Sequence, residues 1–235
     1  IALVRKNQMK LLIDSDIIAY HAAYSAEGNT VSGVIRKVDQ IMENIFYECS
    51  PYNRDFKYST YLTGQGNFRH EISDVYKASR PKEKPLTLAL ARQHLVDKYN
   101  AIETEGQEAD DAIVIEATKL GYDNVVIVSV DKDFKQVPCM FYNYKTGVWT
   151  KIDELGAKYN FWKQVVMGDR VDNIAGLYNW GPKKAERLLE GLTTEEEMFK
   201  AVLGAYDGNL EALTKTAQLV YLRRQEGELW QPPNV

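Results

Sequence analysis

The chain has 235 residues, of which 45% are hydrophobic and 26% charged, and it carries a net charge of −4 at pH 7. This balance predicts a folded globular protein with a substantial core and excludes a disordered or fibrous chain. Its apolar runs are far shorter than the ~20 residues of a membrane-spanning helix, and no signal segment opens the sequence. We therefore expect a cytoplasmic protein with no membrane partner. Cys49 and Cys139 are too few for a disulfide framework.

Apolar spacing predicts alternating strands and helices over the first 150 residues. The predicted strands, which are short and β-prone, are Lys10–Ile13, Tyr58–Leu62 and Asn124–Val130. The predicted helices are 31–46, 86–99 and 109–120, the last ended by Gly121. Alternation of this kind predicts an α/β fold with a mostly parallel, doubly wound sheet.

After Thr150 the strand signal is absent and the spacing becomes helical. The predicted helices there are 161–167, 182–190, 194–203 and 210–221. We therefore expect two domains, an α/β core at 1–150 that carries the chemistry and a C-terminal helical region at 151–235. The ending from Trp230, which contains two prolines, predicts a poorly ordered tail.

Nine acidic residues gather in four short motifs, three of which follow predicted strands or begin a predicted helix. They are Asp14, Asp16, Glu108, Asp110, Asp111, Asp131, Asp133, Asp169 and Asp172. An open α/β sheet binds ligands beyond the carboxyl ends of its strands, so we expect the motifs to converge. Removing nine negative charges from −4 leaves the rest of the chain at +5. An acidic pocket in a mildly basic body is compatible with a nucleic-acid partner.

Each motif taken alone is more readily explained by a helix cap or a turn, where aspartate is common. Taken together, so many carboxylates need cations to offset their repulsion. Oxygen ligands without His or Cys suit Mg²⁺ or Mn²⁺, and paired ions of this kind catalyse displacement at phosphorus. The sequence therefore predicts a phosphodiester hydrolase with two divalent ions.

Two further segments predict contacts with DNA phosphates. Gly181-Pro182-Lys183-Lys184 combines a tight turn, a proline suited to the first helical position and two lysines beside free backbone N–H groups. A basic and aromatic stretch that includes Arg69, Lys77 and Arg80 favours a phosphate clamp. An ordinary Gly-Pro helix start and a solvated surface loop are the alternative interpretations of these segments.

Over about residues 10–190 the chain resembles the PIN-like 5′-nuclease family, which comprises flap endonucleases and 5′→3′ exonucleases. The bacteriophage members of this family are the most similar. The motifs that carry the resemblance, in family order, are Leu12-Ile13-Asp14, Phe68-Arg69, Tyr76-Lys77-Ala78-Ser79-Arg80, Glu108-Ala109-Asp110-Asp111, Ser129-Val130-Asp131-Lys132-Asp133 and Met167-Gly168-Asp169-Arg170-Val171-Asp172-Asn173-Ile174. The resemblance implies a hydrolase that cleaves DNA at 5′ ends and flaps and leaves 5′-phosphates. Phage DNA replication, recombination or RNA-primer removal is the implied setting, in the host cytoplasm.

The resemblance also implies a role for each matched residue. The implied ligands are Asp14, Glu108, Asp110 and Asp131 for the first Mg²⁺ or Mn²⁺, Asp133, Asp169 and Asp172 for the second, and Asp111 for either. The expected catalytic residues are Asp14, Asp110, Asp131, Lys77 and Arg80. The expected DNA-binding residues are Arg69, Lys77, Arg80, Gly181, Lys183 and Lys184, the last three in a helix–three-turn–helix (helix-hairpin-helix) motif that in relatives also holds a monovalent cation such as K⁺. Asp16 is left outside the ligand set.

The implied partners are duplex DNA at 5′ ends, nicks and 5′ flaps, RNA–DNA hybrids and replication proteins, for a monomeric enzyme. Three departures from the family pattern bear on this. No acid stands at Thr63–Asn67, where the family places one, the segment from Lys77 to Glu108 is short for a helical arch, and Asn179 stands where the family has glycine.

Two alternatives remain open from the sequence alone. The missing acid suggests a non-catalytic protein that binds branched DNA, which would leave such DNA intact in the presence of Mg²⁺. A PIN-type ribonuclease would explain the sheet and the acids but not the segment that begins at Gly181.

Overall fold

The computed structural model describes residues 9–49, 57–81 and 83–233, which form two compact units. Unit 1 takes the chain up to Gly66, Lys82–Asp131 and Cys139–Lys151, and unit 2 takes Asn67–Pro81, Lys132–Pro138 and the chain from Ile152 onward. The last of these boundaries lies one residue from the expected division at 150 and 151. The two short inserted segments of unit 2 are not part of that expectation. Among the described residues, no helix has the length and apolar character needed to cross a membrane.

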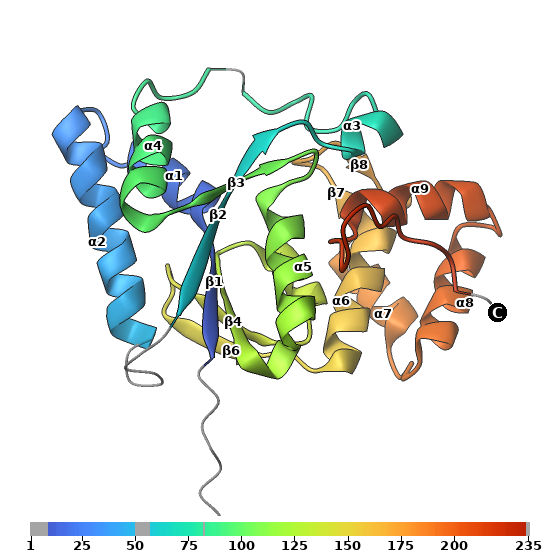
Figure 1. Cartoon of the computed structure of the whole chain (residues 1–235). Helices are drawn as coiled ribbons and strands as arrows, with labels where there is room; N and C mark the ends of the chain where they lie inside the picture. The colour runs from blue at the N-terminus through green and yellow to red at the C-terminus, as the bar shows by residue number, and fades with distance from the viewer. Residues whose placement is uncertain (1–8, 50–56, 82, 234–235) are drawn as a thin grey trace, which may run out of the picture. The chain divides into compact units, whose positions relative to one another are not determined.

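A six-stranded sheet forms the centre of unit 1 (Figure 1). Its strands are β1 (Lys10–Asp14), β2 (Tyr58–Gln65), β3 (Ile102–Glu105), β4 (Val125–Val128), β5 (Met140–Asn143) and β6 (Val148–Lys151). They lie in the order β3-β2-β1-β4-β5-β6, and every neighbouring pair is parallel except the β5-β6 hairpin. This confirms the predicted mostly parallel α/β sheet.

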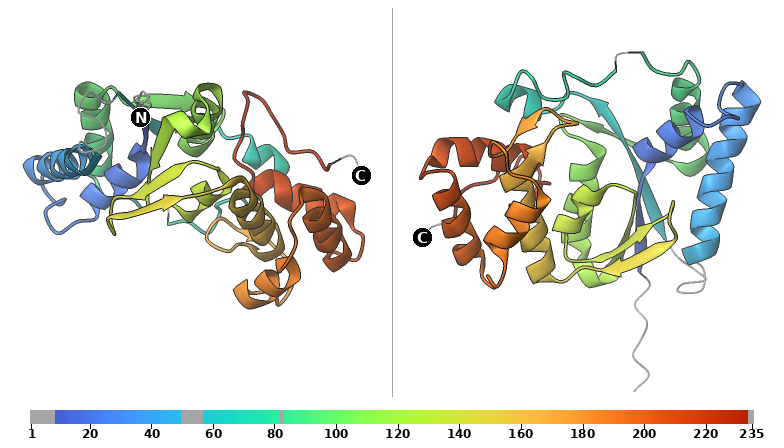
Figure 2. Two further views of the ribbon diagram at one scale, coloured as in Figure 1. Left: turned by 90° about the horizontal axis from the view of Figure 1, so that it is seen from below. Right: turned by 180° about the vertical axis from the view of Figure 1, so that it is seen from behind.

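Helices cover both faces of this sheet. They are α1 (Ser15–Ala23), α2 (Val31–Cys49), α4 (Leu88–Tyr99) and α5 (Ala109–Leu120), with the 3₁₀ turn η1 (Tyr122–Asn124) after α5. Figures 1 and 2 show α1, α2 and α4 on one face and α5 on the other. The first three helices share one hydrophobic core with alternate residues of β1 and β4, such as Leu11, Ile13 and Val126. The central strands β1 and β4 are therefore buried on both faces, which explains why they are almost entirely apolar.

The order of the strands places one reversal of direction at the centre of the sheet. From β1 the chain builds outward to β2 and β3, and it then returns to the other side of β1 to build β4, β5 and β6. The adjacent carboxyl ends of β1 and β4 form the switch point where doubly wound sheets bind ligands. Asp14 ends β1 and Asp131 follows β4, so two predicted ligands lie at this point.

Several elements of unit 1 differ from the prediction. The helix α1 begins directly after Asp14, which caps it, although the sequence predicts only a loop there. The strand β3 reads Ile-Glu-Thr-Glu with one buried residue, so it lacks the apolar signal of the central strands. The strands β5 and β6 also escape the prediction. β6 has no fully buried residue because it lies at the sheet edge.

Unit 2 is helical, as predicted for the C-terminal region. Its helices are α3 (Arg69–Ile72), the 3₁₀ turn η2 (Lys132–Gln136), α6 (Glu154–Met167), α7 (Pro182–Leu189), α8 (Glu195–Ala205) and α9 (Leu210–Val220). They surround a second core that includes Trp162, Val165, Met198 and Leu213. The helix α6 begins seven residues earlier than the predicted segment at 161–167, because Asp153 caps it through a hydrogen bond from Gly156 N–H at 2.7 Å.

A short hairpin follows α6, where the prediction is a helix end. Its strands are β7 (Gly168–Asp169) and β8 (Ile174–Ala175), which pair antiparallel. Gly168 has a φ of 64°, and a Cβ there would lie 2.3 Å from both Ile174 O and Gly176 N. Only glycine fits this close approach of the two strands. The hairpin therefore fixes the loop that carries Asp169 and Asp172.

The predicted disordered tail is wrong at Trp230. This side chain is 7% exposed and belongs to the core of unit 2, with ring centroids 5.9 Å from Phe161 and 5.7 Å from Trp162. Gln218 also donates a hydrogen bond to the Trp230 carbonyl at 3.2 Å. The segment at Trp230 is therefore held by aromatic packing although two prolines follow it.

Trp230→Ala should lower the free energy of unfolding by about 3 kcal/mol, because it opens a cavity among two aromatic rings. Leu229→Ala removes a neighbouring side chain that is 41% exposed, and it should change stability by less than about 0.5 kcal/mol. The stability of the two variants is compared by urea denaturation. Far-ultraviolet circular dichroism is the signal, because tryptophan fluorescence would itself change in Trp230→Ala. Equal stability of both variants would show that the ending does not pack as described.

Candidate active site

Asp14 is a buried carboxylate at the end of β1, and its side chain is held from two directions. Ser129 Oγ donates a hydrogen bond to Oδ2 at 2.7 Å, and the backbone N–H of Ile17 donates to Oδ1 at 3.4 Å. Burial, followed by the negative charge of Asp16, raises the pKa of Asp14 to about 7. This carboxylate is thus fixed in place and poorly solvated, as a ligand for a cation would be.

Ser129 connects Asp14 to Asp131 across the switch point. The backbone N–H of Asp131 donates a hydrogen bond to Ser129 Oγ at 3.0 Å, while the same hydroxyl donates to Asp14. The charge of Asp131 also contributes to the raised pKa of Asp14. The sequence motif contains Ser129 but assigns it no role. Its position directly after β4, at the edge of the sheet where ligands bind, is the sequence feature that could have identified it.

The second acidic motif of unit 1 begins α5. Glu108 is the N-cap of this helix and forms a capping box with Asp111, whose Oδ2 accepts from the Glu108 backbone N–H at 3.2 Å. Asp111 is fully buried and Asp110 half-buried in the first turn. The structure thus gives Asp111 a capping role in addition to its predicted role as a ligand, and leaves Asp110 on the more accessible side.

The end of β2 has no acidic residue, but Thr63 there makes hydrogen bonds to the residues that begin α1 and α5. Thr63 Oγ1 accepts from the Ala109 backbone N–H at 2.9 Å, which ties β2 to the start of α5. Thr63 N–H donates to Asp16 Oδ2 at 2.8 Å. The strand end therefore holds α1 and α5 together through backbone and hydroxyl groups.

Arg92 of α4 completes this arrangement. Its Nη1 donates to Asp16 Oδ1 at 2.5 Å and its Nη2 donates to the Thr63 carbonyl at 2.7 Å. Both oxygens of Asp16 are thus engaged by groups of unit 1, which agrees with its exclusion from the predicted ligand set. No motif in the sequence identifies Arg92, because its partner lies 76 residues away.

Arg92→Met should lower the free energy of unfolding without divalent ions by about 1 to 2 kcal/mol, since it leaves Asp16 without its cation beside Asp14. The excess negative charge should make Mg²⁺ raise the melting temperature of this variant more than that of the unmodified protein. Lys98→Met is the matched control, because Lys98 is also on α4 but pairs with Asp39. Differential scanning fluorimetry with and without Mg²⁺ measures both. An equal Mg²⁺ effect in all three proteins would contradict the account.

In unit 2, the loop of the β7-β8 hairpin is bound by the basic residues Lys77 and Arg80. Arg80 Nε donates to Asp172 Oδ1 at 3.0 Å, and Lys77 Nζ lies 3.7 Å from Asp172 Oδ2. Lys77 has a φ of 56°, and its backbone N–H donates to the Asp172 carbonyl at 2.9 Å. A bulky residue in this left-handed conformation stores strain, which is frequent at functional sites. Lys132 Nζ lies 3.3 Å from Asp169 Oδ2.

Arg69 does not lie at the surface, where the predicted phosphate clamp would need it. Its side chain is 1% exposed, and its guanidinium donates to the carbonyls of Leu219 at 2.9 Å and Tyr221 at 2.7 Å. These bonds satisfy carbonyls at the end of α9. Arg69 therefore anchors α3 within unit 2 instead of facing a phosphate.

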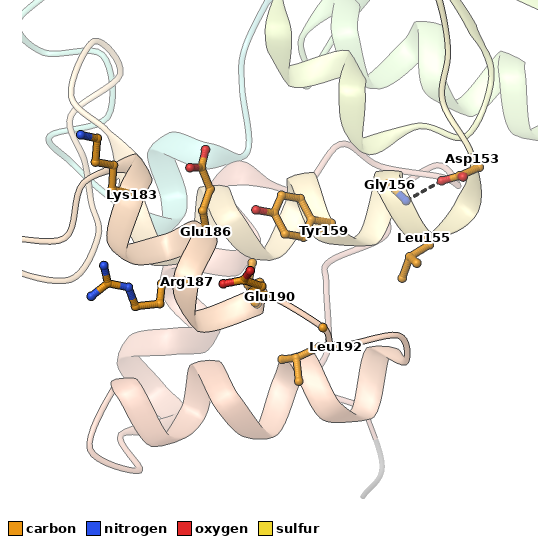
Figure 3. Close-up of a pocket in the computed structure, with 11 residues that line it drawn as sticks. Asp153, Leu155, Gly156, Tyr159, Lys183, Glu186, Arg187, Glu190 and Leu192 are labelled. Carbon is orange, nitrogen blue, oxygen red and sulfur yellow. Dashed lines mark hydrogen bonds between the residues drawn. The ribbon is translucent and has the colours of Figure 1, made fainter.

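The predicted DNA-binding turn is the start of α7. Gly181 is the N-cap and Pro182 the first helical residue, as predicted, and Lys183 and Lys184 are exposed beside them. Figure 3 shows Lys183 with Arg187 on this helix, at an open groove of about 790 Å³ between α6, α7 and the segment before α8. The described lining of this groove includes none of the predicted metal ligands.

In the described part of the chain, no three His, Cys, Asp or Glu side chains approach closely enough to hold a metal ion together. The acids are instead held by Ser129, Arg92, Lys77 and Arg80, as expected for carboxylates that repel one another without a cation. The side chains at the switch point of unit 1 are nevertheless of the chemical kind that binds divalent ions. Their oxygens suit Mg²⁺ or Mn²⁺. A cation would offset both the burial that raises the pKa of Asp14 and the smaller effect of the neighbouring charges of Asp16 and Asp131.

Residues 9–160 match the family model of the 5′-3′ exonuclease N-terminal resolvase-like domain. The chain belongs to the 5′-3′ exonuclease family. It therefore carries a nuclease domain of that family, with Asp14 and Asp131 at the switch point and the acidic start of α5 inside the matched range.

Relatives in the family include two bacterial polymerases. The thermostable DNA polymerase I of Thermus thermophilus is 27% identical over 208 residues, which cover 81% of this chain and 25% of that protein. The DNA polymerase I of Rhizobium leguminosarum is 37% identical over 140 residues, or 52% of this chain and 14% of that protein. The chain thus spans a quarter or less of the length of these relatives.

Solved structures show the same fold at lower identity. A T5 5′-exonuclease with bound zinc ions has a TM-score of 0.66 and 17% identity over 90% of this chain and 88% of that one. A bacteriophage T5 flap endonuclease solved with DNA and metal ions has a TM-score of 0.64 and 16% identity over the same shares. This similarity confirms the predicted α/β fold.

Proposed function

We propose that this chain is a divalent-metal-dependent 5′→3′ exonuclease and flap endonuclease that hydrolyses DNA phosphodiester bonds and leaves 5′-phosphates. The observation that carries the proposal is the pair of acids at the switch point, Asp14 and Asp131, joined by Ser129 inside the range that matches the family. The similarity to T5 enzymes favours a role in phage DNA replication, recombination or removal of RNA primers.

Each unit supplies one set of ligands in this proposal. Asp14, Glu108, Asp110 and Asp131 of unit 1 hold one ion, and Asp133, Asp169 and Asp172 of unit 2 hold another. Asp111 stabilises the start of α5 and is retained as an alternative ligand. When bound, Mg²⁺ or Mn²⁺ supplies charge neutralisation at the phosphate and a more acidic water.

Lys77 and Arg80 bind the scissile phosphate. Both side chains pair with Asp172, and an ion bound by Asp172 would compete for that carboxylate and release them toward a phosphate. The lysine side chain offers a compact positive charge, whereas the arginine side chain offers two parallel N–H donors for two phosphate oxygens. Their shared partner couples their availability to the occupancy of the ligand set in unit 2.

The start of α7 binds DNA phosphates away from the scissile bond. The N-terminus of α7 carries the partial positive charge of the helix dipole, and the exposed Lys183 and Lys184 add positive charge beside it. A monovalent cation such as K⁺ is proposed for the turn before Gly181, where Asn179 already adopts a φ of 60° and so takes the conformation that glycine would allow. These contacts involve phosphates and therefore predict little dependence on base sequence.

The direct test is digestion of blunt duplex, nicked duplex, 5′-flap duplex, RNA–DNA hybrid and single-stranded RNA, each labelled separately at both ends. We expect cleavage from the 5′ end or at the flap base, 5′-phosphate products, and complete loss of cleavage with a chelator. Binding of flap DNA that stays intact with Mg²⁺ would identify a non-catalytic DNA-binding protein. Preferential cleavage of single-stranded RNA would identify a PIN-type ribonuclease.

A further inference from the structure

Asp133 is held by an amide side chain that has no place in the sequence motifs. Gln164 of α6 donates a hydrogen bond from Nε2 to Asp133 Oδ1 at 2.5 Å, within unit 2. A carboxylate accepts hydrogen bonds only, so the amide of Gln164 must present its nitrogen and not its oxygen to Asp133. With its nitrogen toward Asp133, the Gln164 amide donates a hydrogen bond to the carboxylate; with its oxygen there, it would repel the carboxylate.

Gln136 fixes that orientation from the opposite side. Its Nε2 donates to Gln164 Oε1 at 3.2 Å, which leaves the nitrogen of Gln164 for Asp133. The amide of Gln136 is in turn defined by backbone groups at the end of α9. Its Nε2 also donates to the Val220 carbonyl at 2.9 Å, and its Oε1 accepts from the Leu222 N–H at 3.0 Å.

The contacts with the Val220 carbonyl and the Leu222 N–H decide which end of the Gln136 amide is nitrogen and which is oxygen. A carbonyl can only accept a hydrogen bond and an N–H can only donate one. Gln136 is 2% exposed, so water does not compete at its side chain. Arg224 also donates to the Gln136 carbonyl at 2.7 Å, which fastens the end of η2 to the C-terminal segment 221–230. Trp230 anchors the same segment in the core of unit 2.

We propose that Gln164 is a positioning residue that sets the orientation of the Asp133 carboxylate, and that Gln136 relays this order from the C-terminal segment. The proposal rests on the function proposed above, in which Asp133 is a ligand of the ion in unit 2. In this proposal the backbone at Val220 and Leu222 orients Asp133 through three hydrogen-bonded links, from backbone to Gln136, to Gln164 and to Asp133. Partners that orient a ligand typically change metal affinity by about 10- to 100-fold when removed.

Gln164→Met tests the link, because methionine retains the length of the side chain without its amide. Asn160→Leu is the matched control on the same helix. The Asn160 amide donates to the carbonyls of Lys135 at 3.2 Å and Gly156 at 2.7 Å, and not to Asp133. Binding of Mn²⁺ alone is measured by electron paramagnetic resonance, kcat is measured on a 5′-flap duplex across Mg²⁺ concentrations, and melting temperature reports on folding.

We expect Gln164→Met to weaken Mn²⁺ binding at the proposed site of unit 2 about 10-fold. The Mg²⁺ concentration for half-maximal cleavage should rise by a similar factor. Asn160→Leu should leave both within about twofold. In an Asp133→Asn background, Gln164→Met should have no further effect on Mn²⁺ binding, because the positioned carboxylate is already absent. A general packing defect would persist in that background.

The possible failures separate the two proposals. If the unmodified protein neither binds Mn²⁺ nor cleaves DNA, the proposed function is wrong and this inference falls with it. If the unmodified protein does both, and Gln164→Met matches Asn160→Leu or acts equally with and without Asp133, the positioning role of Gln164 alone is wrong.

Discussion

Asp131→Asn should lower kcat on flap or nicked DNA on the order of 1,000-fold while the protein stays folded. Asparagine retains the volume of the side chain and the backbone N–H that donates to Ser129 Oγ. It removes the negative charge at the switch point, where the proposed ion of unit 1 binds. Asp110→Ala should have an effect of the same order, because that carboxylate lies on the accessible side of the start of α5.

Asp123→Asn is the control for this experiment. Asp123 is another aspartate of unit 1, but its side chain is 91% exposed and pairs with Lys151 at the surface. Single-turnover cleavage at saturating Mg²⁺ should be unchanged in Asp123→Asn, and urea denaturation should show all three variants folded. Near-normal turnover in either Asp131→Asn or Asp110→Ala would mean that the ion site of unit 1 is assigned to the wrong residues.

Lys77→Met should lower kcat about 100-fold, with a smaller change in DNA affinity, if its ammonium stabilises charge on the scissile phosphate in the transition state. The methionine retains most of the side-chain length, and the strained backbone at φ 56° is the same for both residues. Arg80→Met should reduce kcat by a comparable factor. Single-turnover rates and filter-binding constants, measured on the same 5′-flap substrate, separate the catalytic loss from the loss of binding.

Lys163→Met provides the comparison for this second experiment. Lys163 is a partly exposed lysine of unit 2 whose Nζ lies 2.6 Å from Glu186, so its removal also breaks one ion pair. Loss of such a pair changes stability by about 1 kcal/mol or less and should leave cleavage unchanged. The assigned role of Lys77 is incorrect if Lys77→Met and Lys163→Met have the same rate.

The central strands are predictable because they are continuously apolar, and the long helices are predictable because their apolar residues recur at helical spacing. The helix at Ala109–Leu120 is found with the predicted bounds, since a capping pair precedes it and Gly121 follows it. The strand β3 is not predictable by the same argument, because only Thr104 of its four residues is buried. Edge strands and capped loops carry too little apolar pattern to be distinguished from irregular segments.

The residues of the candidate site are likewise of two kinds, those that sequence position predicts and those that only tertiary contacts reveal. Asp14 and Asp131 follow directly from the strands that precede them, whereas Arg92 and Gln164 act through partners far away in the sequence. Arg69 shows the opposite error, because a basic residue beside an aromatic one suggests a surface clamp and is instead buried against carbonyls. Sequence spacing identifies the groups that carry charge, but only tertiary contacts show which of them face solvent.

The helix α4 bears on the choice of substrate. Its residues Leu88, Ala91, Leu95 and Tyr99 are buried in the same core as α1 and α2, so α4 is part of the body of unit 1. The sequence places this helix within the segment from Lys77 to Glu108, which is short for a helical arch. Its burial argues instead for a structural element, and it leaves the preference for flaps to be decided by the labelled substrates described above.

The most direct test of the account is where divalent ions bind. Crystals soaked in Mn²⁺ and measured for anomalous scattering should show one peak among the carboxylates of Asp14, Asp110 and Asp131. A second peak should lie beside Asp133, Asp169 and Asp172, and both should disappear after treatment with a chelator. Absence of a peak at Asp14 in a crystal that cleaves DNA after soaking would contradict the central claim that these carboxylates hold the catalytic ion.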